Sequence, residues 1–70
     1  MHSKSAALLG ILRDERVARN LEPESLSASL GLHPHVIARW EEGTQRPRLS
    51  SAVRWAEALG FEIQITRRAL

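Results

Sequence analysis

The chain has 70 residues, which is enough for one small domain around one hydrophobic core. It contains no cysteine, which excludes a disulfide framework and a thiolate-bound metal as sources of stability. Its formal net charge is +2, and all but one of its 10 basic residues are arginine, the type that pairs with phosphate through two hydrogen bonds. No apolar run approaches transmembrane length and no signal-peptide pattern is present, so we expect a cytoplasmic protein without membrane contacts.

The first predicted helix covers residues 3–19. Its apolar residues recur at three- and four-residue spacing and give one buried face; they are Leu8, Leu9 and Leu12. Arg16 continues this stripe, and two interpretations are open: a long side chain that reaches solvent, or one partner of a partly buried ion pair. Asn20 tolerates the left-handed conformation and therefore predicts the end of the helix.

Two short helices are predicted on either side of Gly31, at residues 23–30 and 34–42. Each starts with a proline, whose missing N–H and fixed φ suit the first turn of a helix. Gly31 follows the point at which the first of them must stop, and glycine adopts the left-handed conformation readily. Two helices joined by a short turn with glycine are typical of a helix-turn-helix, here over about residues 22–42.

A loop rich in hydrogen-bond donors follows, and then a fourth helix that Ser50 is expected to cap and that ends near Gly60. Its expected core edge consists of Leu49, Ala52, Val53, Ala56 and Leu59. Trp55 lies off this edge. It either folds over the edge of the domain or anchors an interface with another molecule.

After Gly60 the pattern changes, because residues 61–66 alternate strictly between apolar and polar side chains, as a β-strand does. A lone strand cannot satisfy its own backbone. We therefore expect it to pair with the same strand of a second copy across a two-fold axis; the alternative is a tail packed on its own domain. Residues 61–70 are thus the predicted dimerisation element, separate from the domain at residues 1–60. The candidate dimer contacts are Trp55, Phe61, Ile63 and Ile65.

Arginines gather just after the turn, whereas acidic residues are concentrated earlier. Any one of these arginines would by default belong to a solvated surface. Their concentration around one motif favours nucleic acid over a membrane or an acidic ligand as the partner. They are Arg39, Arg46, Arg48 and Arg54.

Three motifs occur together: Leu-Gly-Leu at residues 30–32, Ile-x-Arg-Trp-Glu-x-Gly at 37–43 and Arg-Pro at 46–47. In combination they resemble the Xre/Cro family of lambda-repressor-like DNA-binding domains, over nearly the whole chain from about residue 8 to residue 60. The resemblance implies an all-α fold, here a compact four-helix bundle, that binds operator DNA as a dimer. The predicted strand replaces the family's last helix, and that ending is similar to HipB-like antitoxins, in which the strand joins two subunits.

The resemblance also implies roles for individual residues. The helix at 34–42 becomes the recognition helix, which enters the major groove by its N-terminal end. The candidates for reading bases are His35, Val36, Ala38 and Arg39. The candidates for contacting the DNA backbone are His33, Thr44, Gln45, Arg46 and Arg48. Arg16 corresponds to a first-helix arginine that forms a structural ion pair with the glutamate found here as Glu41.

Two departures from the family pattern stand out. His33 occupies a position where the family usually has a serine or threonine cap, and histidine is a weaker cap. Glu22 and Glu24 flank Pro23 where a polar residue usually contacts phosphate, and acidic side chains should repel the DNA backbone. This acidic edge supports an alternative function, a protein-interaction module that has kept the fold and lost DNA binding.

The expected function is a homodimeric transcriptional repressor that binds a palindromic operator. Two settings are open. The protein is either an antitoxin that binds a cognate toxin and represses its own operon, or a phage-type or free-standing regulator. We expect no enzymatic activity, because no nucleophile–base pair and no glycine-rich phosphate loop is evident. His33 and His35 lack a third ligand, so we expect neither a metal nor a cofactor. Protonation of these histidines near phosphate would instead strengthen binding.

Overall fold

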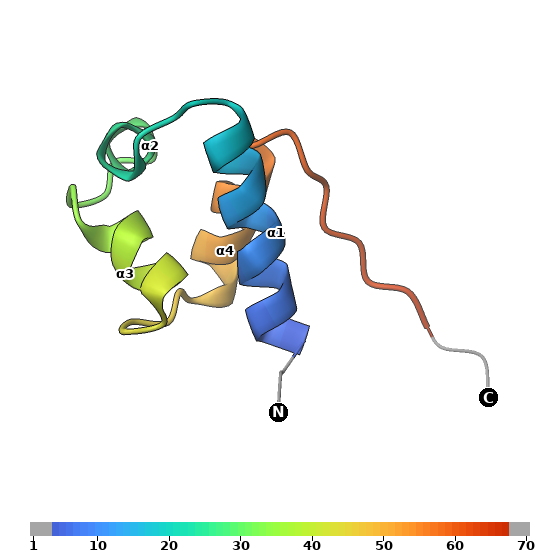
Figure 1. Cartoon of the computed structure of the whole chain (residues 1–70). Coiled ribbons are helices and arrows are strands. Elements are labelled where there is room, and N and C mark those ends of the chain that lie inside the picture. Colours follow the sequence, from blue (N-terminus) through green and yellow to red (C-terminus); the bar gives the residue numbers. More distant parts are fainter. Residues whose placement is uncertain (1–3, 68–70) are drawn as a thin grey trace.

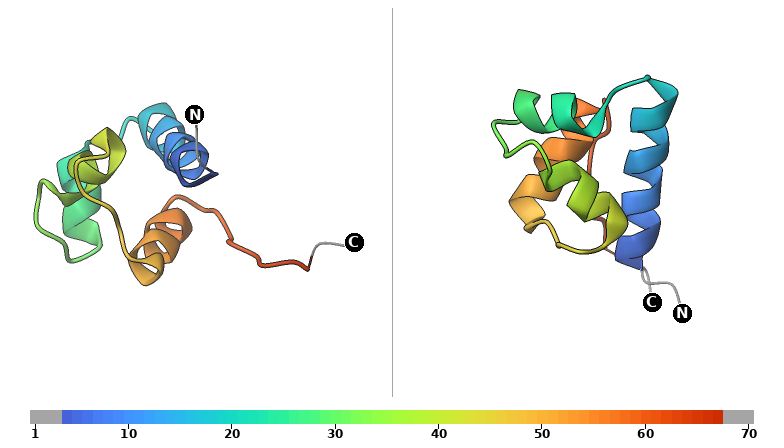
Figure 2. Two further views of the ribbon diagram at one scale, coloured as in Figure 1. Left: turned by 90° about the horizontal axis from the view of Figure 1, so that it is seen from below. Right: turned by 60° about the vertical axis from the view of Figure 1, so that its left-hand side comes forward.

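The computed structural model describes residues 4–67, which form a bundle of four helices. These are α1 (Lys4–Ala18), α2 (Pro23–Ser29), α3 (Val36–Glu42) and α4 (Leu49–Ala58). Figure 1 shows α2 and α3 at one side of the bundle and α1 with α4 at the other. α3 packs against both α1 and α2, and the left view in Figure 2 shows α2 and α3 together on one flank. The predicted all-α helix-turn-helix architecture is therefore present.

One hydrophobic core joins the four helices, and each helix contributes residues spaced by three or four positions. The buried apolar residues are Leu12, Leu26, Leu30, Ile37, Trp40, Ala52, Trp55, Ala56 and Leu59. The rings of Trp40 and Trp55 lie 5.5 Å apart between centroids and are tilted by 40°. Trp55 is 0% exposed, so the prediction that it contributes to a dimer interface is wrong. Its indole fills the centre of the monomer.

Each helix ends in the same way, with a left-handed residue and two reversed backbone hydrogen bonds. The left-handed residues are Asn20, Gly31, Gly43 and Gly60. After α4, for example, the N–H of Gly60 donates to the carbonyl of Glu57 at 3.0 Å and that of Phe61 donates to Ala56 at 2.9 Å. This Schellman arrangement satisfies carbonyls that the end of a helix leaves free. The predicted stops at Asn20 and Gly31 are confirmed.

The helix starts differ from the predictions. α3 begins at Val36, because residues 34 and 35 form a turn in which the Val36 N–H donates to the His33 carbonyl at 3.1 Å. His33 is thus not its cap. α4 begins at Leu49 with Arg48 as N-cap, so the expected cap at Ser50 is wrong as well. Leu49 is 74% exposed, because it lies in the first turn of α4 beyond the reach of the core.

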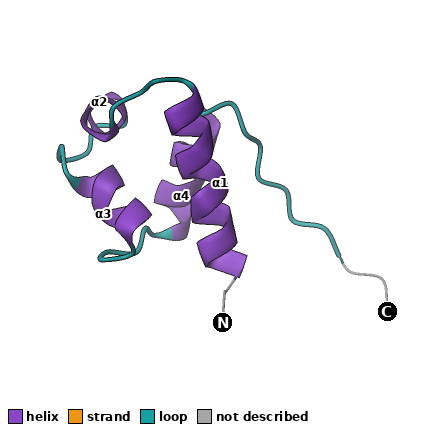
Figure 3. Ribbon diagram, in the orientation of Figure 1, coloured by secondary structure: helices purple, strands orange, loops and turns teal. Residues whose placement is uncertain are grey.

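The C-terminal segment leaves the bundle in an extended conformation (Figure 3). Residues 61–67 are not paired into a strand within the single described chain, so the expected pairing with a second copy stays a prediction. Phe61 and Ile63 are half-buried against the core, whereas Ile65 is 95% exposed. None of the helices described, including the 15-residue α1, has both the length and the apolar character needed to cross a bilayer.

Candidate nucleic-acid interface

α3 has a buried side and an exposed side. Ile37 and Trp40 point inward and are 0% and 4% exposed. His35, Arg39 and Glu42 are exposed, and their spacing of four and three residues places them along the opposite edge. The helix therefore offers a polar edge to a partner while its other side is fixed in the core.

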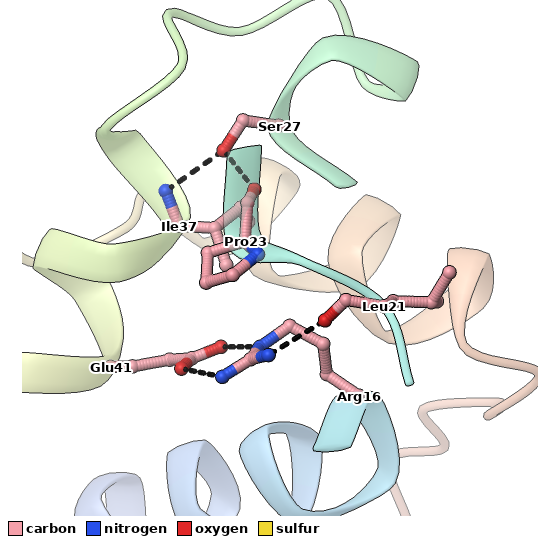
Figure 4. A network of polar contacts seen from close by, with 6 residues as sticks. All are labelled: Arg16, Leu21, Pro23, Ser27, Ile37 and Glu41. Atoms are coloured by element: carbon pink, nitrogen blue, oxygen red, sulfur yellow. Dashed lines mark hydrogen bonds and ion pairs between the residues drawn. The ribbon is translucent and has the colours of Figure 1, made fainter. Parts of the chain in front are cut away.

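Arg16 and Glu41 anchor the C-terminal half of α3 to α1 (Figure 4). The guanidinium Nε donates to Glu41 Oε2 at 2.7 Å and Nη2 donates to Oε1 at 2.8 Å, a bidentate pair. Nη1 donates to the carbonyl of Leu21 at 2.7 Å, just before α2. The two charged side chains are only 11% and 8% exposed, so the expected ion pair is present and nearly buried. Its hydrogen bond to Glu41 raises the pKa of Arg16 above the ordinary value, although burial opposes the shift.

Ser27 connects α2 to the first turn of α3. Its hydroxyl donates to the Pro23 carbonyl at 2.8 Å and accepts from the Ile37 N–H at 3.2 Å, as Figure 4 shows. The residue is 0% exposed. The bond satisfies one of the backbone N–H groups that the start of a helix leaves without a partner.

Arg54 is exposed like the other arginines of the cluster, but its guanidinium also makes a structural contact. Its Nη2 donates to the carbonyl of Leu30 at 2.8 Å, so α4 holds the end of α2. The other three arginines of the cluster are exposed as well: Arg39, Arg46 and Arg48. The basic surface near the turn is therefore formed by α3 and the loop that follows it.

A family model described as Helix-turn-helix (HTH_3) matches residues 12–65, more than half of the chain. The chain belongs to this helix-turn-helix family. The match includes α2, the turn at Gly31 and α3, and the family's members are DNA-binding domains of transcription regulators. Searches of curated proteins and of solved structures each gave no match.

The loop of this helix-turn-helix domain carries the remaining DNA-backbone candidates. Thr44 is bound to the end of α3. Its N–H donates to the Arg39 carbonyl at 3.0 Å and its Oγ1 donates to the same oxygen at 3.3 Å. Gln45, Arg46 and Arg48 follow as exposed side chains. The loop is thus held at the end of α3, with its donors directed to solvent.

The four base-reading candidates differ in how far their side chains are exposed to solvent. His35 and Arg39 are exposed, but Val36 is half-buried and packs partly against the core. Ala38 is also half-buried and lines a shallow depression between α1, α2 and α3, whose other lining residues are Arg13, Arg16, Pro23, Glu41 and Glu42. His35 and Arg39 therefore have the most freedom to reach a base edge.

Two features bear on charge at this surface. His33 and His35 are exposed, with ring centroids 5.5 Å apart, and the described residues hold no cluster of three or more side chains fit to bind a metal ion. Glu22 and Glu24 are exposed at the start of α2. Acidic and titratable groups are thus exposed on the helix-turn-helix together with the basic side chains.

The roles of three residues of this surface and its support were not predicted from the sequence. Ser27 could have been noticed, since it lies three residues before Leu30 and four after Pro23, on the inner side of its helix. Glu42 follows Arg39 at helical spacing, so its place on the outer edge was also predictable. Arg54 gave no such signal, because its partner is 24 residues away.

Proposed function

We propose that the chain is a sequence-specific transcriptional regulator that inserts α3 into the major groove of operator DNA as a homodimeric repressor. The exposed edge of α3 supports this proposal most, because His35 and Arg39 extend from a helix whose opposite side is fixed by Ile37 and Trp40. An α-helix fits the major groove of B-DNA, where each base pair offers a distinct pattern of donors and acceptors.

Base reading and backbone contact fall to different residues in this proposal. Arg39 is suited to a bidentate contact with guanine O6 and N7, and His35 reaches the bases or the adjacent phosphates from the N-terminal end of α3. The methyl groups of Val36 or Ala38 would meet a thymine methyl at the cost of a small shift, since both are half-buried. His33 and the side chains of residues 44–48 would contact phosphates and set the register.

The dimer would form through the extended C-terminal segment. Residues 61–66 alternate in polarity, and the exposed side chain of Ile65 offers apolar surface for a second copy. Pairing of the two segments would satisfy the backbone groups of both strands and place two recognition helices on a palindromic site. A repressor that is also the antitoxin of a neighbouring toxin fits this arrangement, as does a phage-type or free-standing regulator.

Selection of bound sites from random DNA tests the proposal. We expect a palindromic consensus whose half-sites are about 10 base pairs apart, or a multiple of that spacing. Mobility shifts of the selected duplex should weaken steeply as salt rises, because phosphate contacts release counterions. Failure to enrich any sequence, together with absence of a shift at low salt, would refute the proposed function.

A second candidate function is a protein-interaction module on the same fold. The exposed carboxylates of Glu22 and Glu24 favour it, because they would repel the DNA backbone where the domain approaches it. Replacing both with glutamine separates the two candidates. A DNA-binding domain should gain affinity for duplex DNA, whereas a module that has lost DNA binding should show none with either sequence.

A further inference from the structure

The starts of the short helices in this domain lack local caps. The N-cap residues Glu22, His35 and Arg48 make no side-chain hydrogen bond to the first turn of α2, α3 and α4. At α3 the cap comes from another helix, because the hydroxyl of Ser27 on α2 accepts from the Ile37 N–H. Among the buried residues of the described chain, Ser27 is the one polar side chain.

The position of this hydroxyl leaves no substitute for it. Ser27 and Ile37 are both 0% exposed, so a water molecule would have to enter the core to replace the bond if the hydroxyl is removed. The same hydroxyl gives its proton to the Pro23 carbonyl, which leaves a lone pair directed at the Ile37 N–H. A serine hydroxyl has one proton and two lone pairs, so these two contacts are mutually consistent. The first turns of α2 and α3 are thereby tied to one atom.

We propose that Ser27 is a positioning residue for base reading, because it fixes the first turn of α3 relative to α2. The inference rests on the proposed DNA-binding function and assigns a source of its specificity. His35, a proposed base-reading residue, is the N-cap of α3 and directly precedes the turn that Ser27 holds. Contacts that distinguish bases need their supporting residues fixed to within about 0.5 Å. Phosphate contacts from the flexible side chains of the loop are less demanding.

The two anchors of α3 act at opposite ends. Arg16 holds the C-terminal half through Glu41, and Ser27 holds the N-terminal turn. Removal of the Ser27 hydroxyl therefore leaves α3 attached to the bundle while releasing the end that enters the groove. Alanine at this position has a high helix propensity and occupies no more volume than serine.

The test compares Ser27→Ala with Ser29→Ala as a matched control in the full chain. Ser29 lies on the same helix, is exposed, and donates at 2.8 Å to the carbonyl of Leu26, a residue of its own helix. We expect Ser27→Ala to speed hydrogen exchange of the Ile37 amide roughly tenfold, as expected for a lost cap. The ratio of affinities for the selected duplex and for a scrambled duplex of equal composition should fall by a similar factor, roughly tenfold. Affinity for the scrambled duplex should stay within about twofold of the wild-type value, because it depends on phosphate contacts alone. The control should match the wild type in both measurements.

Two outcomes separate the role of Ser27 from the DNA-binding function. If the wild type prefers the selected duplex and Ser27→Ala keeps that preference, the role of Ser27 is refuted while the DNA-binding function stands. If the wild type itself does not distinguish the duplexes, the DNA-binding function fails first. Should Ser27→Ala not fold, Ser27→Cys repeats the comparison, because the thiol is a weak acceptor of similar shape.

Discussion

Replacement of Glu41 with alanine is expected to destabilise the fold strongly, because it leaves Arg16 charged and without its bidentate partner. Two of the three hydrogen bonds of the guanidinium are lost, at 2.7 and 2.8 Å, and only the bond to the Leu21 carbonyl remains. Breaking a buried ion pair from one side costs about 3–5 kcal/mol. The side chains of Arg16 and Glu41 retain 11% and 8% exposure, which places the expected loss near the lower end, about 3 kcal/mol.

That loss is large for a domain of this size. A chain of 70 residues is expected to have a stability of about 4–10 kcal/mol. A loss of about 3 kcal/mol corresponds to a fall in melting temperature of about 12–24 °C in a domain this small. Thermal and urea unfolding followed by circular dichroism would measure it. A melting temperature within about 2 °C of the wild-type value would refute the reasoning.

Two further variants test whether the loss of stability comes from the ion pair or from any substitution in α3. Glu42→Ala changes the neighbouring exposed carboxylate and should alter stability by less than about 0.5 kcal/mol. The double variant Arg16→Met/Glu41→Leu removes both charges and should recover part of the loss of stability, because no buried charge is left unpaired.

The pKa of Arg16 is raised, so the stabilising effect of the ion pair is complete below the unfolded-state pKa of arginine and is lost only in strong alkali. The deficit of Glu41→Ala should accordingly be the same at pH 7 and pH 9.

Three other substitutions test the DNA-binding and dimerisation proposals. Arg46→Ala should weaken binding evenly across sequences and reduce the slope of log K against log salt by about 1, measured by titration at several salt concentrations. Arg39→Ala should relax the preference at one base position by about 1–3 kcal/mol in a repeated site selection, and an unchanged consensus would remove Arg39 from the reading role. Ile65→Asp should convert a dimer to a monomer in sedimentation experiments while the helical content measured by circular dichroism stays unchanged, since the side chain is 95% exposed in the single chain. Dimers that persist would place the contact elsewhere.

The ends of the helices were predictable because their chemistry is local. Glycine and asparagine adopt the left-handed conformation that a Schellman stop needs, and that preference is readable in one residue. The starts were not predictable to the same degree. The first turn of α3 depends on Ser27, ten residues earlier in the chain, and a cap supplied by another helix is visible only after the helices are packed.

The error in α4 concerned which of its faces is buried. Leu49 was expected in the core and Trp55 outside it, but the buried edge consists of residues 52, 55, 56 and 59. These positions also follow the helical repeat. The large apolar area of Trp55 settles the choice between the two faces, because burying an aromatic side chain stabilises more than burying a leucine in the first turn of the helix. The ion pair was partly predictable: a charge on the apolar stripe indicated a partner for Arg16, but Glu41 came from the family resemblance.

The strand predicted for residues 61–66 requires two copies of the chain, so a single chain cannot show it. Alternation of polarity describes a strand with one buried face, and a strand exists only with a neighbour that pairs with its backbone. In the single chain Phe61 and Ile63 use their apolar side chains against the core instead. A dimer that forms the strand would retain those contacts and add backbone pairing beyond them.

α3 owes its orientation to directional contacts as well as to packing. Hydrophobic burial fixes which side of α3 faces inward but constrains its rotation and tilt weakly, because the effect is non-directional. Hydrogen bonds depend on angle and distance, and here they act at both ends of α3, from Ser27 and through Glu41. Neither anchor uses a residue of the outer edge. Substitutions at His35 and Arg39 should consequently change which bases are preferred while leaving the melting temperature nearly unchanged. A variant at either position that melts much earlier than the wild type would show that the reading edge also supports the fold.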